Sequence, residues 1–162
     1  MSRSWMILPF LTLITWPATA NDTTEADLAT LERCVAEAGS DQQRCIGNIA
    51  DTCQDQPGGS STAGIDDCLG QERAAWDMIL NQNYRSAIAA AKEQDASYLE
   101  QAMQTGAAKS LLKAQRAWIA FRDAECDRRF EMYKDGTIRT NIASSCLLEM
   151  TARRALELTT EN

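Results

Sequence analysis

The sequence predicts an all-α protein: a small, disulfide-stapled bundle of about three longer helices, preceded by an N-terminal helical hairpin. Apolar residues recur every three or four positions over long stretches, most clearly in residues 111–126, which is the spacing of one helix face. No stretch of useful length alternates between apolar and polar residues, so no sheet is expected. The even number of cysteines, 6, indicates disulfides in an exported chain.

The first twenty residues have the layout of a secretory signal peptide. Arg3 precedes an apolar run over residues 6–16, and the small residues at 18–20 form a cleavage site. The apolar run is short for a helix that spans a bilayer. Cleavage after Ala20 leaves one domain, residues 21–162, and removes Arg3, so the formal net charge changes from −7 to −8. The mature chain is therefore expected to be periplasmic or secreted, without a membrane span.

The composition excludes several classes of site. The chain has no histidine, which removes His-based catalytic triads and c-type haem attachment. No C-x-x-C pair, Gly-rich phosphate loop or G-x-S-x-G motif occurs, so zinc, nucleotide and serine-hydrolase sites are not expected. We therefore expect no metal, no cofactor and no enzymatic activity. The acidic net charge disfavours nucleic acid and favours basic protein partners.

Residues 21–56 are expected to form the N-terminal hairpin. Helix start and stop signals predict two short helices over residues 25–38 and 41–53, with the turn at Gly39. A loop rich in Gly and Ser, residues 56–64, separates this hairpin from the longer helices.

Residues 62–158 contain the longer helices. The first of them ends either at Gly106 or near residues 95–97, where a second capping box occurs. The central helix is predicted over residues 107–132 and the last helix over residues 141–158.

All of the cysteines are expected to pair, and they are Cys34, Cys45, Cys53, Cys68, Cys126 and Cys146. Cys126 and Cys146 lie ten residues on either side of Gly136, so an antiparallel hairpin that folds at this glycine brings them level. In the N-terminal hairpin the first cysteine lies opposite the second, which leaves the third and fourth to close the loop. These two pairings are one choice among the fifteen connectivities that six cysteines allow.

Two sequence blocks and a late group of residues carry a recognisable pattern. The first block is W-D-x-x-L-N-x-x-Y over residues 76–84, and the second is A-Q-R-A-W-I-A-F-R-D-A-E-C over residues 114–126. Cys146, Thr151 and two arginines at 153–154 follow. This combination resembles the LprI-like lysozyme-inhibitor domain, which is found in many bacterial envelope proteins.

The resemblance covers roughly residues 68–158 and implies a small, helical, exported protein. For the member that gives the family its name, it implies binding and inhibition of lysozyme. That member is a lipoprotein, whereas no cysteine follows the expected cleavage site in this chain.

The motif residues divide into an apolar and a polar set. The apolar set is expected to form the bundle core, and it consists of Trp76, Leu80, Tyr84, Trp118 and Phe121. The polar set is expected to form a network between helices, and it consists of Asp77, Asn81, Gln115 and Arg122, with Thr151 able to bond to its own helix or to join the network. A pair between Arg122 and Asp77 would match the planar guanidinium to a carboxylate. A ligand site made from the polar set is the alternative.

These observations favour an exported binding protein that inhibits lysozyme by steric and electrostatic obstruction of a cationic enzyme. The expected contact is the acidic, Gly-rich segment 51–67, with Asp55, Asp66 and Asp67 facing the partner. The alternative is a non-inhibitory envelope interaction or stress module with another protein partner.

Overall fold

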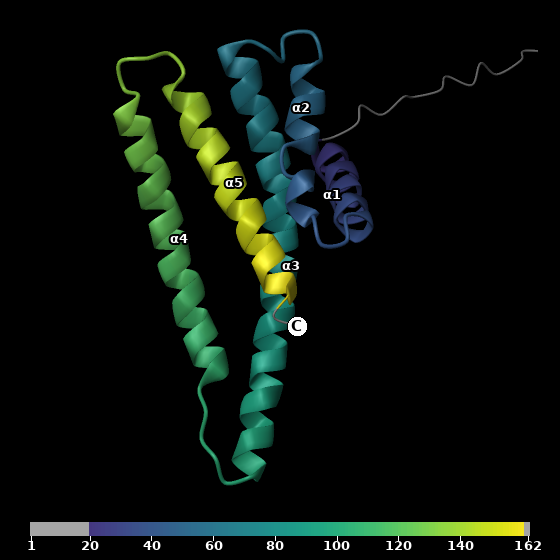
Figure 1. Ribbon diagram of the computed structural model, residues 1–162, viewed down its shortest axis with the longest axis vertical. Coiled ribbons are helices and arrows are strands. Elements are labelled where there is room, and N and C mark those ends of the chain that lie inside the picture. The colour runs from purple at the N-terminus through teal and green to yellow at the C-terminus, as the bar shows by residue number, and fades with distance from the viewer. Residues whose placement is uncertain (1–19, 161–162) are drawn as a thin grey trace, which may run out of the picture.

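The computed structural model describes residues 20–160, and over that range it consists of helices without strands (Figure 1). The elements are α1 (Ala20–Glu37), the 3₁₀ helix η1 (Gln42–Cys45), α2 (Asn48–Gln54), α3 (Thr62–Glu100), α4 (Ala107–Met132) and α5 (Arg139–Thr160). The predicted all-α class is confirmed. The predicted signal peptide lies almost wholly outside the described residues.

The long helix α3 organises the bundle, because α1, α2, α4 and α5 all pack against it. In Figure 1, α1 and α2 lie along one side of α3, while α5 lies between α3 and α4. The core forms where the first half of α3 meets α1, α2 and α5. It is built around Trp76 of α3, which is fully buried together with Leu31 of α1 and Leu158 of α5.

The second helix of the N-terminal hairpin differs from the prediction. A continuous helix was expected over residues 41–53, but η1 and α2 are separated by an extended Ile46 and by Gly47, whose φ is +100°. This positive φ suits glycine, which has no Cβ to clash with the backbone. The break turns the first backbone N–H groups of α2 toward a side chain on α3.

That side chain is Glu72, which is fully buried. Its Oε1 accepts hydrogen bonds from Gly47 N at 2.7 Å and from Trp76 Nε1 at 2.9 Å. Its Oε2 accepts from Ile49 N at 3.0 Å and from Ala50 N at 2.8 Å. The carboxylate therefore satisfies the N–H groups that the start of a helix leaves unpaired, and it ties α2 to α3.

Three disulfides are present, and no free cysteine remains. They join Cys34 to Cys45, Cys53 to Cys68, and Cys126 to Cys146, which are the pairs that the sequence favoured. The first closes the α1–η1 turn, the second joins α2 to α3 across the loop, and the third joins α4 to α5.

The turn between α3 and α4 lies at residues 101–106 and includes Gly106, so the turn predicted there is confirmed and the alternative near residues 95–97 is wrong. α3 itself ends at Glu100, six residues before this glycine. The helix continues past Asp95, and the side chain of this residue bonds to the start of the next helix. Its carboxylate accepts from Ala107 N at 2.9 Å and from Ala108 N at 3.1 Å, and also from the Thr105 hydroxyl. The hydrogen bond from Thr105, followed by that from Ala107, lowers the pKa of Asp95 below its ordinary value.

Candidate functional site

The apolar motif residues do not all lie in the core. Trp76 and Leu80 are buried, whereas Tyr84 and Trp118 are half-buried. Phe121 is 61% exposed, so its expected place in the core is wrong. Helix α4 turns one narrow face to the bundle, and Phe121 lies away from that face.

The expected pair between Arg122 and Asp77 is absent from the structure. Asp77 and Asn81 are exposed on α3, where Asn81 Nδ2 donates to Asp77 Oδ2 at 2.9 Å. They lie one position round the helix from Trp76 and Leu80, which face the core. Because of this one-position offset, Asp77 and Asn81 lie on the solvent side of α3 and do not join the expected network.

The other polar motif residues meet at a seam between α4 and α5. Gln115 is buried, and its Oε1 accepts from Arg154 Nε at 3.1 Å. Arg154 also donates to Glu157 at 3.0 Å. The seam thus gives Gln115 a partner on α5, Arg154, which is one of the two arginines that follow Thr151 in the sequence pattern.

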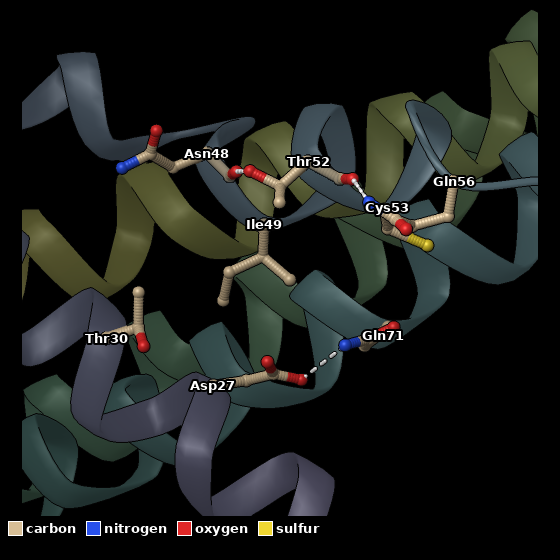
Figure 2. Close-up of a pocket in the computed structure, with 8 residues that line it drawn as sticks. All are labelled: Asp27, Thr30, Asn48, Ile49, Thr52, Cys53, Gln56 and Gln71. Carbon is tan, nitrogen blue, oxygen red and sulfur yellow. Dashed lines mark hydrogen bonds between the residues drawn. The ribbon is translucent and has the colours of Figure 1, made fainter. Parts of the chain in front are cut away.

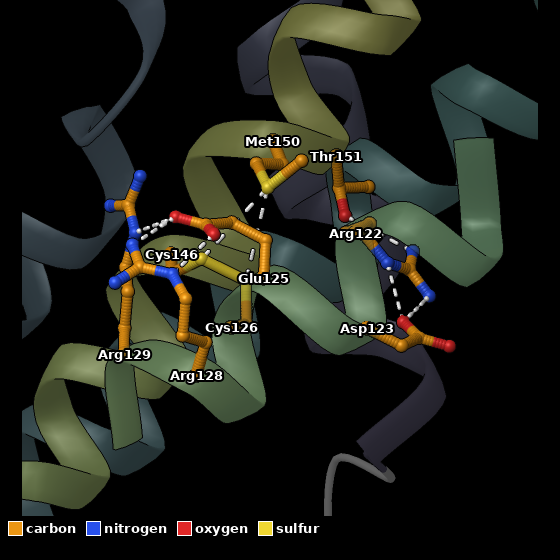
Figure 3. The surroundings of a disulfide bond; sticks show 9 residues. All are labelled: Arg122, Asp123, Glu125, Cys126, Arg128, Arg129, Cys146, Met150 and Thr151. Atoms are coloured by element: carbon orange, nitrogen blue, oxygen red, sulfur yellow. Dashed lines mark hydrogen bonds and ion pairs between the residues drawn. A yellow bond between two sulfur atoms is a disulfide. The ribbon is translucent and has the colours of Figure 1, made fainter. Parts of the chain in front are cut away.

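Further along the seam, Arg122 lies over the Trp118 ring, 5.2 Å from its centroid, in a cation–π arrangement. It pairs with Asp123 at 2.8 Å and donates to the Thr151 hydroxyl at 3.4 Å (Figure 3). Thr151 is fully buried. Of its two expected roles, the structure shows the contact with the polar network, through Arg122, and not, among the described residues, a bond to its own helix. The seam is occupied by contacts within the chain, which favours a structural role for these residues.

The seam ends at the Cys126–Cys146 disulfide, where Met150 Sδ lies 3.9 Å from both sulfur atoms (Figure 3). Beside it, Glu125 pairs with Arg128 at 2.7 Å and with Arg129 at 3.0 Å. The hydrogen bond from Arg128, followed by that from Arg129, lowers the pKa of Glu125 from 4.5 to about 2.

Replacing Arg128 with Gln is expected to return the pKa of Glu125 part of the way to its ordinary value of 4.5. Because the folded-state pKa is depressed, the stabilising contribution of this carboxylate is present above pH 4.5 and is lost as the pH falls toward 2. A ¹³C NMR titration of the Glu125 carboxyl measures both values. Lys134→Gln, which removes an exposed charge that pairs with Glu131 and not with Glu125, is the control. An identical Glu125 titration in wild type and Arg128→Gln would contradict the assignment.

The three aspartates expected to face a partner have different surroundings. Asp55, which directly follows α2, and Asp67, in the second turn of α3, are exposed. Asp66 is half-buried and accepts a hydrogen bond from the Ser144 hydroxyl of α5. Two of these carboxylates are therefore exposed to solvent, one after α2 and one on α3, while the third helps to hold α3 to α5.

A groove with a volume of about 530 Å³ lies between α1, α2 and α3 (Figure 2). Ile49 and Cys53 give it an apolar floor, and most of its exposed surface is apolar. Its rim is polar, and Asp27 of α1 accepts there from Gln71 Nε2 of α3 at 2.7 Å. Asp27 is the one charged residue among those that line the groove.

No group of three or more His, Cys, Asp or Glu side chains within residues 20–160 is placed to hold a metal ion. None of the helices described is both long enough and apolar enough to cross a membrane.

A family model described as lysozyme inhibitor LprI matches residues 53–158. The chain belongs to the LprI family. An uncharacterised protein of Rhizobium meliloti is 37% identical over 92 residues, which is 56% of this chain and 66%, just under two thirds, of that protein. No solved structure matches.

The LprI match begins at Cys53, so α1, η1 and most of α2 precede it. Together with the loop and the start of α3 they form what we call the acidic unit, residues 21–67. This unit has ten acidic and two basic residues, a net charge of −8, whereas residues 68–162 have thirteen of each. The expected contact, segment 51–67, is one part of this unit, and a charge count along the chain identifies the whole of it.

Proposed function

We propose that this protein is an exported lysozyme inhibitor, periplasmic or secreted, that binds a cationic lysozyme. The observation that carries the proposal is membership of the LprI family over residues 53–158. Three disulfides without a free cysteine support an oxidising compartment.

Inhibition follows from docking, and no chemical step by the inhibitor is needed. The acidic unit attracts a cationic enzyme and raises the rate of encounter. The Cys34–Cys45 disulfide closes the α1–η1 turn inside this unit and Cys53–Cys68 joins the unit to α3, so little conformational entropy is lost on binding. The docked body then obstructs the saccharide cleft.

Replacing Asp55 and Asp67 with Asn is expected to raise the inhibitor concentration for half-inhibition of lysozyme about threefold at low salt, because two exposed charges are each worth under about 1 kcal/mol. The salt dependence of inhibition should become flatter. Asp66 is left unchanged, since it bonds to Ser144. The assay is turbidimetric lysis of cell walls by lysozyme.

The matched control is Glu93→Gln with Glu100→Gln, which removes two exposed charges near the end of α3 remote from the α2–α3 loop (Figure 1). Inhibition should be nearly unchanged in this control. Equal inhibition by wild type and both double variants would exclude Asp55 and Asp67 from the interface. Absence of inhibition by the wild type would favour an envelope module with another partner.

A further inference from the structure

We infer that the groove between α1, α2 and α3 receives a basic side chain, arginine or lysine, from the surface of the cationic partner. This inference rests on the proposed function and assigns a contact within it. All of the residues that line the groove except Gln71 belong to the acidic unit, and most of them lie outside the region that the LprI family model matches.

The first argument is the shape and surface of the groove. A volume of about 530 Å³ with a floor of Ile49 and Cys53 offers apolar surface to the methylene stem of a long basic side chain. Such stems pack on apolar surface while their charged heads remain near water or a counter-ion. Ile49 is buried and belongs to the packed core, whereas Cys53 is half-buried.

The second argument is the charge at the rim. Asp27 has no ion pair with a cation in the described part of the chain, and its hydrogen-bond partner there is the neutral amide of Gln71. The amide fixes one carboxylate oxygen, Oδ2, and leaves acceptor sites on the carboxylate for a further donor. Figure 2 shows Asp27 and Gln71 bonded to each other across from α2, with the Ile49 side chain pointing from α2 toward them.

The third argument is the composition of the rest of the rim. It consists of neutral hydroxyl and amide side chains, namely Thr30, Asn48, Thr52, Gln56 and Gln71. These groups can accept hydrogen bonds from the donors of a guanidinium or an ammonium group. Since the surrounding acidic unit has a net charge of −8, a cation is favoured over an anion or a neutral ligand at this position.

Asp27→Asn tests the inference, because Asn retains the shape and can still accept from Gln71. The matched control is Asp41→Asn, an exposed residue of the same acidic unit without a side-chain cap contact. We expect Asp27→Asn to raise the dissociation constant for lysozyme about tenfold and Asp41→Asn to raise it less than about threefold. Isothermal titration calorimetry measures both values.

A second measurement separates this inference from the proposed function. N-acetylarginine amide, titrated into ¹⁵N-labelled protein, should shift the amide signals of Ile49, Thr52 and Gln71 in wild type and not in Asp27→Asn. Equal losses of lysozyme affinity in the two variants would overturn the inference while leaving inhibition intact. If lysozyme binds none of the proteins, the proposed function fails, and the titration with the arginine amide alone tests the groove. Shifted amide signals would then support binding of a basic side chain in the groove, and unshifted signals would overturn it.

Discussion

Replacing Glu72 with Gln is expected to lower the free energy of unfolding by about 3 kcal/mol, because a buried carboxylate loses charge-assisted hydrogen bonds and buried donors lose a partner. Each carboxylate oxygen accepts two hydrogen bonds, from Gly47 and Trp76 or from Ile49 and Ala50. Whichever way the amide of Gln turns, its NH₂ group faces two N–H donors. Two hydrogen bonds are therefore lost, and the NH₂ donor of Gln is held against two other N–H donors.

Urea unfolding with the disulfides intact measures this loss. The matched control is Asp77→Asn, an exposed carboxylate on the same helix, which should change stability by no more than about 0.5 kcal/mol. A similarly small change for Glu72→Gln would show that the carboxylate does not hold α2 to α3 in solution.

The double replacement Cys126→Ser with Cys146→Ser is expected to lower the free energy of unfolding by about 3 kcal/mol, as chain-entropy models give for a loop of this length. The effect should be concentrated in α4. The structure describes every residue of α4, and Gln115 and Cys126 are the only buried ones in this helix. Losing the disulfide therefore removes one of the two buried anchors of this helix.

Amide hydrogen exchange tests where the effect lies. Protection should fall along α4 in the double variant, while α3 retains its protection. Cys34→Ser with Cys45→Ser is the control, because that bridge lies in the α1–η1 turn and should leave α4 unchanged. Full protection of α4 without Cys126–Cys146 would contradict the account of how this helix is held.

The helix boundaries were predictable where local signals fix them. The limits of α4, Ala107–Met132, coincide with the prediction because a glycine stop precedes the helix and a polar turn follows it. The Cys126–Cys146 pair was equally accessible, since a short hairpin sets the register of its two helices.

The partners of polar side chains were not predictable in the same way. Which helix face meets which neighbour depends on the whole bundle, so a one-position step moved Asp77 to solvent, and Phe121 proved exposed. Glu72 gave no signal, because a glutamate in an amphipathic helix resembles a solvent-facing residue. Glu72 lies four residues before Trp76, and this spacing was the one sign in the sequence that the two side chains could bond. The spacing did not identify Gly47 or α2 as further partners of the carboxylate.

The charge of the acidic unit was available from the sequence, but its meaning depended on the fold. The structure brings α1 and α2 together against α3, so charges that are dispersed along residues 21–67 belong to one packed unit. The groove that contains Asp27 exists only because these three helices meet.

The most direct test of the account is the inhibition of lysozyme by the purified, oxidised chain, measured by cell-wall lysis at low and at physiological salt. The account predicts saturable inhibition at near-stoichiometric inhibitor, weaker at physiological salt and weaker again after reduction of the disulfides. Lysis at the uninhibited rate at every concentration and at both salt concentrations would contradict it.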